Sequence, residues 1–201
     1  MTLVLASASP RRAEILRTLG FIFQVAPSDA DETVLSGESP GAHAERLART
    51  KAESAARRYA AAHVLAGDTV VTLDGEILGK PRDDDDAVRM LLRLQGRSHD
   101  VVSALALGLP PGEGSLGRRT LAGIEVTAVN FRPFGRAFAE AYVATGEPLD
   151  KAGAYGIQGM GAALVERIQG DYTAVVGLPV PLLLRLMEQG GLPYRFGAVG
   201  D

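Results

Sequence analysis

The chain has 201 residues, 46% of them hydrophobic, and carries a formal net charge of −3 at pH 7. This weak negative charge excludes a general affinity for nucleic acid or for an anionic membrane, so any anion site must be a local cluster of basic residues. The chain has no Cys, which excludes disulfides, thiolate nucleophiles and cysteine metal sites.

The length suits one domain, residues 1–201, with a single sizeable core. No run of apolar residues approaches the roughly 18 that a membrane-spanning helix needs. The apolar stretch at residues 3–6 is also too short for a signal peptide. We therefore expect a soluble, cytoplasmic protein.

Short β-type runs alternate with helical patterns along the chain, which predicts an α/β fold. Pro10 and Pro40 suit the first positions of helices, and Asp74-Gly75 suits a hairpin turn. Residues 109–119, rich in Pro and Gly, suit a longer hairpin loop. We expect strands at residues 3–6, 21–26, 64–66, 69–73, 76–78, 101–107, 124–131 and 163–168, and helices at residues 11–19, 40–61, 83–94 and 136–144 and from Pro179 or Pro181 to about residue 190.

The loop between the first strand and the first helix, Ser7-Ala8-Ser9-Pro10-Arg11-Arg12, is the first candidate site. Ser9 suits the N-cap, but Arg11 and Arg12 oppose the helix dipole, which favours negative charge in a first turn. The free amides, the Ser7 hydroxyl and two guanidinium groups would together bind a polyphosphate. Arg12 lies one turn before an apolar stripe, so we expect its guanidinium to be held in place. The alternative is an ordinary capped helix with solvent-facing arginines.

Two acidic residues form a candidate metal and base site. Asp68 lies at a break between two β-rich runs, where the carboxyl end of a strand would place it beside a ligand. The alternative is a turn aspartate bonded to its own backbone. Glu32 belongs to the polar loop 27–39, which also holds Asp29 and Asp31, and loop acids are ordinarily solvated. Two carboxylates beside a polyphosphate suit a hydrated Mg²⁺.

Two lysines and one glutamine complete the candidates. Lys80 precedes a proline that stiffens the backbone, so it is a stronger candidate than Lys51, which a long helix would by default place on the surface. Gln158 lies among the small residues of segment 150–159, which would permit close backbone approach to a flat ligand. Its amide offers a donor and an acceptor, matching the edge of a nucleobase. The alternative is a tight turn with a surface glutamine.

Five short motifs follow one another along the chain: Ser-x-Ser-Pro-Arg-Arg (7–12), Asp-Thr-Val-Val (68–71), Gly-Lys-Pro (79–81), Gly-Arg-Ser-His-Asp-Val (96–101) and Asp-Lys-Ala-Gly-Ala-Tyr-Gly-Ile-Gln-Gly (150–159). Together they resemble the Maf family of nucleoside triphosphate pyrophosphatases. The resemblance implies an α/β fold with a twisted mixed β-sheet flanked by helices, in two lobes around a deep cleft, related to the inosine triphosphatase-like hydrolases. It also implies hydrolysis of a nucleotide to its monophosphate and pyrophosphate with a divalent metal cation, Mg²⁺ or Mn²⁺, commonly by a homodimer.

The resemblance implies roles for individual residues as well. Asp68 matches the family's catalytic proton acceptor, and Glu32 matches a second, metal-associated acid. Arg11, Thr69 and Gln158 match positions associated with the choice of base. The residues that match phosphate ligands are Ser7, Arg11, Arg12, Lys51 and Lys80.

The unbroken segment Ala-Tyr-Gly-Ile-Gln-Gly (154–159) resembles the branch of the family that acts on dTTP and UTP. The branch that acts on 7-methyl-GTP has a Trp in its first loop, whereas this chain has no Trp. Two alternatives stay open: a pyrophosphatase for 7-methyl-GTP or another modified nucleotide, and a nucleotide-binding regulator of cell division. We expect no nucleic-acid or membrane partner.

Overall fold

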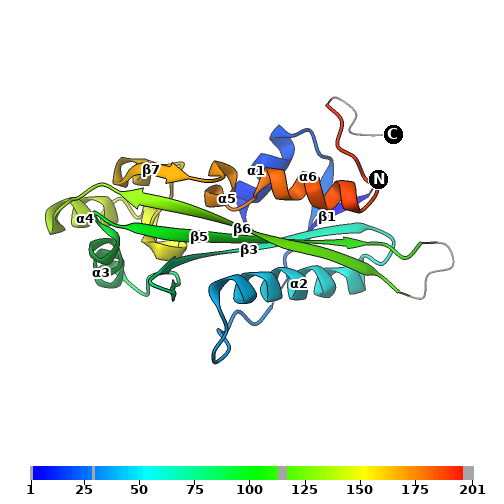
Figure 1. Ribbon diagram of the computed structural model, residues 1–201, viewed down its shortest axis with the longest axis horizontal. Helices are drawn as coiled ribbons and strands as arrows, with labels where there is room; N and C mark the ends of the chain where they lie inside the picture. Colours follow the sequence, from blue (N-terminus) through cyan, green and yellow to red (C-terminus); the bar gives the residue numbers. More distant parts are fainter. Residues whose placement is uncertain (1, 29, 113–116, 197–201) are drawn as a thin grey trace.

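A computed structural model describes residues 2–28, 30–112 and 117–196 (Figure 1). Asp29 of the polar loop and part of the 109–119 loop lie outside the described residues. The strands are β1 (Leu3–Leu5), β2 (Phe23–Val25), β3 (His63–Leu73), β4 (Glu76–Leu78), β5 (Ser98–Leu109), β6 (Arg119–Phe131) and β7 (Val165–Gln169). The α-helices are α1 (Pro10–Thr18), α2 (Pro40–Arg58), α3 (Asp84–Leu94), α4 (Arg136–Val143), α5 (Tyr172–Val176) and α6 (Val180–Gln189), and the 3-10 helices are η1 (Glu147–Asp150), η2 (Ala152–Ala154) and η3 (Met160–Leu164).

Within the described residues, the strands form one mixed sheet in the order β2-β1-β3-β5-β6-β7, with β4 paired to β3. β1 runs parallel to β2 and β3, whereas the pairs β3–β5, β5–β6 and β6–β7 are antiparallel. The three long strands β3, β5 and β6 extend through the whole molecule (Figure 1). The predicted mixed sheet flanked by helices is therefore confirmed.

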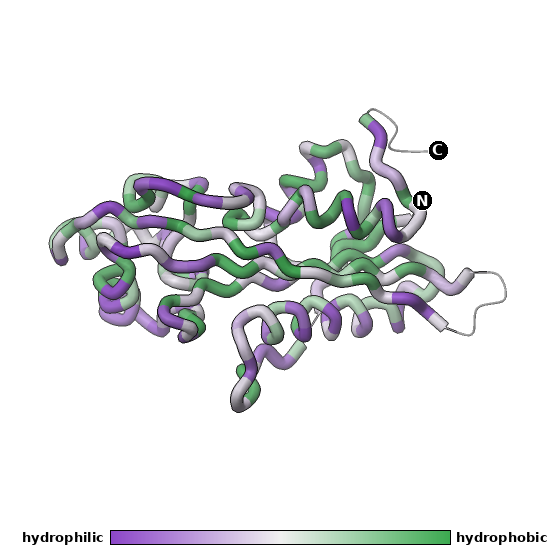
Figure 2. The backbone as a smooth tube through the Cα atoms, in the orientation of Figure 1, coloured by the Kyte–Doolittle hydropathy of each residue, from purple (hydrophilic) through white to green (hydrophobic). Residues whose placement is uncertain are grey.

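Helices cover both faces of the sheet. α2 lies against one face, and α1 and α6 lie against the other (Figure 1). The face of α2 that meets the sheet is made of small residues, such as Ala48 and Ala52, which allow the helix to approach the strands closely. Larger side chains fill the opposite face, where Leu16, Leu105 and Leu183 belong to one buried cluster. Figure 2 shows hydrophobic segments where the strands and α6 meet and hydrophilic segments on the outer side of α2.

A second group of elements covers the far end of the sheet. α3 and α4 pack there around Phe131 and Tyr155, next to the 3-10 helices (Figure 1). Both this end and the α1–α2–α6 end are built on the long strands β3, β5 and β6. Loops from the two ends can therefore face one another across the surface of the sheet. None of the helices in the described part of the chain is long and apolar enough to cross a membrane.

One expectation about β3 is wrong. Residues 64–66 and 69–73 are a single strand, and Asp68 lies in its middle, opposite Ala104 of β5, and not at a strand end. β5 supplies pairing partners along almost the whole of β3, so the ladder continues through Gly67 despite the low strand propensity of glycine. Tertiary pairing here overrides the local signal.

Other boundaries differ modestly. α5 is missing from the sequence-based prediction because five residues are too few for a helical period to show. The strand predicted at 163–168 begins later because η3 occupies residues up to Leu164. β5 and β6 pair from Ser98 opposite Asn130 to Leu109 opposite Arg119, which confirms the hairpin and lengthens both strands.

Candidate active site

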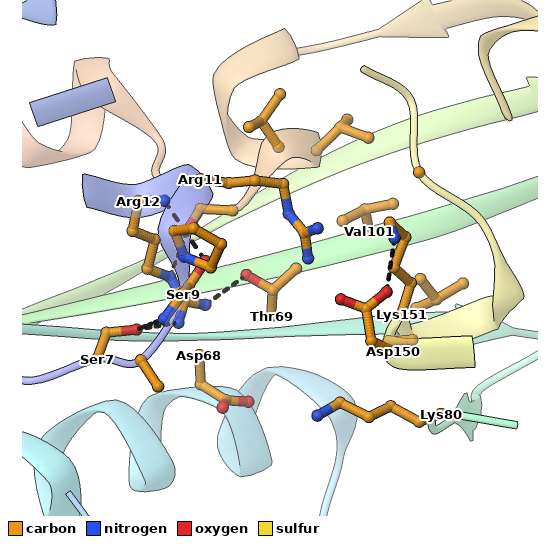
Figure 3. Close-up of a pocket in the computed structure, with 18 of the residues that line it drawn as sticks. Ser7, Ser9, Arg11, Arg12, Asp68, Thr69, Lys80, Val101, Asp150 and Lys151 are labelled. Atoms are coloured by element: carbon orange, nitrogen blue, oxygen red, sulfur yellow. Dashed lines mark hydrogen bonds and ion pairs between the residues drawn. The ribbon is translucent and has the colours of Figure 1, made fainter. Parts of the chain in front are cut away.

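One cavity of about 660 Å³ lies between the two groups of helices (Figure 3). Its walls come from the β1–α1 loop, the middle of β3, α2 and the segment around η1 and η2. All the site residues predicted from the sequence line it: Ser7, Arg11, Arg12, Glu32, Lys51, Asp68, Thr69, Lys80 and Gln158. The tertiary structure thus brings together residues more than 150 positions apart in the chain.

The β1–α1 loop has the predicted capped geometry. Ser9 is the N-cap of α1, and its hydroxyl accepts a hydrogen bond from the Arg12 amide at 3.4 Å. The buried Ser7 hydroxyl accepts from the Ser9 amide at 3.2 Å. The loop is therefore fixed by its own serines at the N-terminus of a helix, where backbone amides favour an anion.

The Arg12 guanidinium is held in place, as the sequence predicts, and hydrogen bonds to other groups of the protein hold it. Its Nε donates to Gly177 O at 2.7 Å, and its two terminal nitrogens donate to Ser7 Oγ and Thr69 Oγ1, each at 3.0 Å (Figure 3). Burial lowers the pKa of the guanidinium, and the charge of Asp68 partly offsets this effect. Since a guanidinium has five N–H groups, two remain for a ligand after these bonds.

Arg11 and Lys80 differ from Arg12 because their charged ends are unpaired. Among the described residues, neither side chain has a hydrogen-bond or ion-pair partner. Figure 3 shows Arg11 reaching over the cavity from α1, with Lys80 extending toward Asp68 from the other side. Two unpaired cations facing one cavity suit an anionic ligand with several charges.

Lys51 joins the two predicted acids. Its Nζ lies 2.6 Å from Glu32 Oε1 and 2.8 Å from Asp68 Oδ1. Lys51 and Asp68 are each only 8% exposed, so the surface position expected for this lysine is wrong. The hydrogen bond from Lys51 lowers the pKa of Glu32, with smaller contributions from the charges of Lys51, Lys80 and Arg12. Lys51 thereby holds two carboxylates side by side at the cavity wall.

The acids fit a divalent cation only in part. The described residues contain no cluster of three or more His, Cys, Asp or Glu side chains that could hold a metal by themselves. Lys51 engages one oxygen of each acid, and within the described residues Glu32 Oε2 and Asp68 Oδ2 have no hydrogen-bond partner. Mg²⁺ usually takes one or two protein oxygens and completes its shell with phosphate and water, so this donor set fits a metal that arrives with a phosphate ligand.

The glycines of segment 150–159 have a different role from the one expected. A Cβ at Gly156 would meet the Lys151 side chain at 2.7 Å, and a Cβ at Gly159 would overlap the Glu147 carboxylate. The missing side chains make room for protein groups, not for a flat ligand. Gln158 itself is exposed and lines the cavity at this end.

Glu147 is a cavity residue that sequence reasoning missed. Its carboxylate accepts hydrogen bonds from the Met160 and Gly161 amides and from the Tyr142 hydroxyl. The local sequence Gly146-Glu147-Pro148 resembles an ordinary surface turn, so only its nearness to the 150–159 motif could have drawn attention to it.

The chain matches the family described as Maf-like protein over residues 2–190. The chain belongs to the Maf family. Its curated relatives include the dTTP/UTP pyrophosphatase of Symbiobacterium thermophilum, which is 48% identical over 198 residues that cover 98% of each chain. The dTTP/UTP pyrophosphatase of an Anaeromyxobacter species is also 48% identical, over 98% of this chain and 94% of the relative.

A solved structure supports the fold of this Maf-family chain. The Ham1 protein of Staphylococcus aureus superposes with a TM-score of 0.51, covering 94% of this chain and all of the Ham1 chain. The two sequences are 17% identical, so the likeness concerns the fold alone. It agrees with the mixed sheet flanked by helices described above.

Proposed function

We propose that this protein hydrolyses the nucleoside triphosphates dTTP and UTP to the monophosphate and pyrophosphate. The observation that carries the proposal is the bridge from Lys51 to Glu32 and Asp68, in a cavity that Arg11 and Lys80 also face. A carboxylate set among cations suits an enzyme that must bind a polyanion and activate water beside it. The names of the relatives support the same activity and favour dTTP and UTP over 7-methyl-GTP.

The triphosphate lies across the N-terminus of α1 in this proposal. The unpaired charges of Arg11 and Lys80 reach it from opposite sides, and Arg12 offers the two N–H groups that its protein partners leave free. Ser7 and Lys51 complete the phosphate ligands. Hydrogen bonds already hold Ser7, Arg12 and Lys51 in place, so these three groups reorganise little on binding.

Asp68 is the proton acceptor. Lys51 occupies its Oδ1, which leaves Oδ2 to accept a proton from a water molecule. The water oxygen forms a bond to the α-phosphorus while the bond from this phosphorus to the bridging oxygen breaks. The proton goes to Asp68, and the bonding electron pair leaves with pyrophosphate. Positioning and charge stabilisation contribute most of the catalysis, as in other phosphoryl transfers.

Glu32 and Asp68 are the residues that would hold a divalent cation, Mg²⁺ or Mn²⁺. When bound, such an ion would supply positive charge that neutralises the phosphate oxygens. Among the described residues Glu32 Oε2 has no hydrogen-bond partner, which supports this assignment. A carboxylate oxygen has two lone pairs, so Asp68 could contact the ion through a lone pair other than the one that accepts the water proton. A substrate phosphate would have to provide further ligands.

Gln158, Thr69 and Arg11 select the base in this proposal. The Gln158 amide pairs with a base edge that carries a carbonyl and an N–H, as in uracil and thymine. Cytosine presents a different edge, and a site that leaves polar groups unpaired against the wrong ligand discriminates strongly.

The remaining expectations rest on family resemblance and composition. We infer one catalytic domain, because β3, β5 and β6 run through both groups of helices. A homodimer and a cytoplasmic location follow from the resemblance and the sequence composition, and we infer no nucleic-acid or membrane partner.

Pyrophosphate release from a panel of dTTP, UTP, CTP, GTP and 7-methyl-GTP tests the proposal, with and without Mg²⁺ or Mn²⁺. We expect release from dTTP and UTP with the metal and little release from the others. Equal turnover of CTP and UTP would contradict the assigned base recognition. Nucleotide binding without any pyrophosphate release would favour a regulatory protein instead.

A further inference from the structure

The Glu147 carboxylate accepts hydrogen bonds from three donors on η3 and α4. Met160 N donates to its Oε2 at 2.8 Å, while Gly161 N and the Tyr142 hydroxyl donate to its Oε1 at 3.1 and 2.9 Å. The Tyr142 hydroxyl in turn accepts from Gly156 N at 3.2 Å. These bonds tie both ends of segment 156–161 to Glu147 and α4.

Two glycines of this segment leave space for the Glu147 carboxylate and for the Tyr142 hydroxyl that bonds to it. A Cβ at Gly159 would overlap the Glu147 carboxylate, and a Cβ at Gly161 would lie 2.6 Å from the Tyr142 hydroxyl. The Lys151 ammonium donates to the Glu147 backbone carbonyl at 2.6 Å, which fixes Glu147 from the other side. The segment is therefore shaped around the carboxylate.

The carboxylate is ionised at neutral pH. Burial raises the pKa of Glu147, but the Gly161 and Met160 amides and the Tyr142 hydroxyl together outweigh this effect, so the pKa is lowered overall. Hydrogen bonds to an ionised acceptor are about twice as strong as neutral ones, so three of them make an effective clamp.

Gln158 lies inside the clamped segment, two residues before Met160, and no described residue forms a hydrogen bond with its side chain. Its position over the cavity therefore depends on the backbone that carries it. We infer that Glu147 is a positioning residue for base recognition, holding segment 156–161 so that the Gln158 amide faces the base. This inference rests on the proposed function, in which Gln158 reads the base.

The glutamate cannot be replaced by its amide. Both carboxylate oxygens accept bonds from donors, and in Glu147→Gln one of them becomes an NH₂ group facing an N–H. Glu140→Gln is a matched control, because Glu140 lies on α4, is exposed and, among the described residues, pairs through its side chain only with Arg136.

The first test compares UTP with ribose 5-triphosphate, which has no base. In Glu147→Gln we expect KM for UTP to rise about tenfold with kcat changed less than about threefold, since ground-state positioning is lost. Turnover of ribose 5-triphosphate should stay within about twofold of wild type, and the preference for UTP over CTP should shrink. An equal fall for both substrates would overturn the inference, and so would an unchanged KM for UTP.

A double mutant tests whether Glu147 acts through Gln158. In a Gln158→Ala background, Glu147→Gln should change KM for UTP by less than about twofold, because the interaction it supports is already gone. A full, additive effect would mean that Glu147 acts by another route and would overturn the inference.

Amide hydrogen exchange tests the clamp without substrate. The Met160 and Gly161 amides should exchange about tenfold faster in Glu147→Gln than in wild type or Glu140→Gln. Unchanged exchange rates would show that Glu147 does not hold segment 156–161, whatever the activity measurements give, and would overturn the inference. If wild type releases no pyrophosphate from UTP while the exchange result holds, the proposed function fails and the clamp stands. Should Glu147→Gln not fold, Tyr142→Phe removes one donor and should give smaller changes in the same direction.

Discussion

The Thr69 and Ser103 hydroxyl oxygens lie 2.8 Å apart, and Ser103 Oγ donates its proton to Ala174 O at 2.7 Å. A serine hydroxyl has one proton, so Ser103 must accept from Thr69. Thr69 Oγ1 also accepts from Arg12. Thr69 therefore donates its hydroxyl proton to the fully buried Ser103. In any further hydrogen bond the Thr69 oxygen can only accept. An acceptor suits the N–H of uracil or thymine and not the bare ring nitrogen of cytosine.

Replacing Ser103 by Ala should weaken both the fold and the choice of base. The Ala174 carbonyl loses its buried donor, which costs about 1–3 kcal/mol of unfolding free energy. Without Ser103 Oγ to accept it, the Thr69 hydroxyl proton can rotate, so Thr69 is no longer restricted to accepting a hydrogen bond. The preference for UTP over CTP should therefore fall. Urea unfolding and the ratio of kcat/KM for the two nucleotides measure these effects. Ser98→Ala, at an exposed position on the same strand, is the control, and an unchanged ratio in Ser103→Ala would contradict the argument.

Replacing Asp68 by Asn should abolish most turnover and spare the fold. The amide oxygen can still accept from Lys51, but the side chain can no longer take a proton from water. We expect kcat to fall about a hundredfold or more, the usual scale for a lost general base. Nucleotide affinity and the melting temperature should change little. Asp100→Asn, an exposed acid on the neighbouring strand, serves as the control; wild-type turnover in Asp68→Asn would remove Asp68 from the catalytic role.

Replacing Arg12 by Lys should destabilise the protein even though the charge is kept. A lysine ammonium cannot reproduce the fork that reaches Gly177 O, Ser7 Oγ and Thr69 Oγ1 together. At least one buried acceptor then loses its donor, at a cost of about 1–3 kcal/mol. Urea unfolding measures this loss, and weaker nucleotide binding should accompany it. The exposed Arg17 on the same helix provides a matched Arg17→Lys control, and equal stabilities would show that the fork is dispensable.

His99 should make the protein less stable in acid. Burial lowers the pKa of His99 to about 4, and its Nε2 lies 2.9 Å from the Tyr155 hydroxyl. The folded pKa lies below the unfolded value, so between pH 6.5 and pH 4 the unfolded chain binds a proton that the folded chain does not. Stability therefore falls through this window as pH falls, by up to about 3 kcal/mol.

The measurement compares wild type with His99→Gln, which removes the titrating group. Urea unfolding at pH 7 and at pH 4.5 should show a larger loss of stability on acidification in wild type than in the variant. Effects of the carboxylates are shared by both proteins and cancel. Equal losses would mean that His99 titrates alike in the folded and unfolded states.

Local signals predicted most helices and strands because their causes are local. Ser9, Ser39 and Asp83 each cap a helix through a side chain that bonds an amide three residues on. Local signals misplace Asp68 at a strand end because the ladder that carries β3 through Gly67 pairs this glycine with Leu105, 38 positions away. Glu147 was missed for the same kind of reason, since two of its three donors are backbone amides 13 and 14 positions along the chain.

The sequence alone determined which groups were available: a run of serines and arginines at a helix start, two acids, two lysines, and motifs ordered as in one family. The tertiary structure decided which of these groups are buried, which are paired with other protein groups and which face the cavity. Folding buried Lys51 between Glu32 and Asp68 and committed three N–H groups of Arg12 to the protein. It left the side chains of Arg11 and Lys80 at the cavity with no hydrogen-bond or ion-pair partner in the part of the chain that the structure describes. The physical reason is that hydrogen bonding and burial depend on neighbours in space, which residue type and spacing along a chain do not specify.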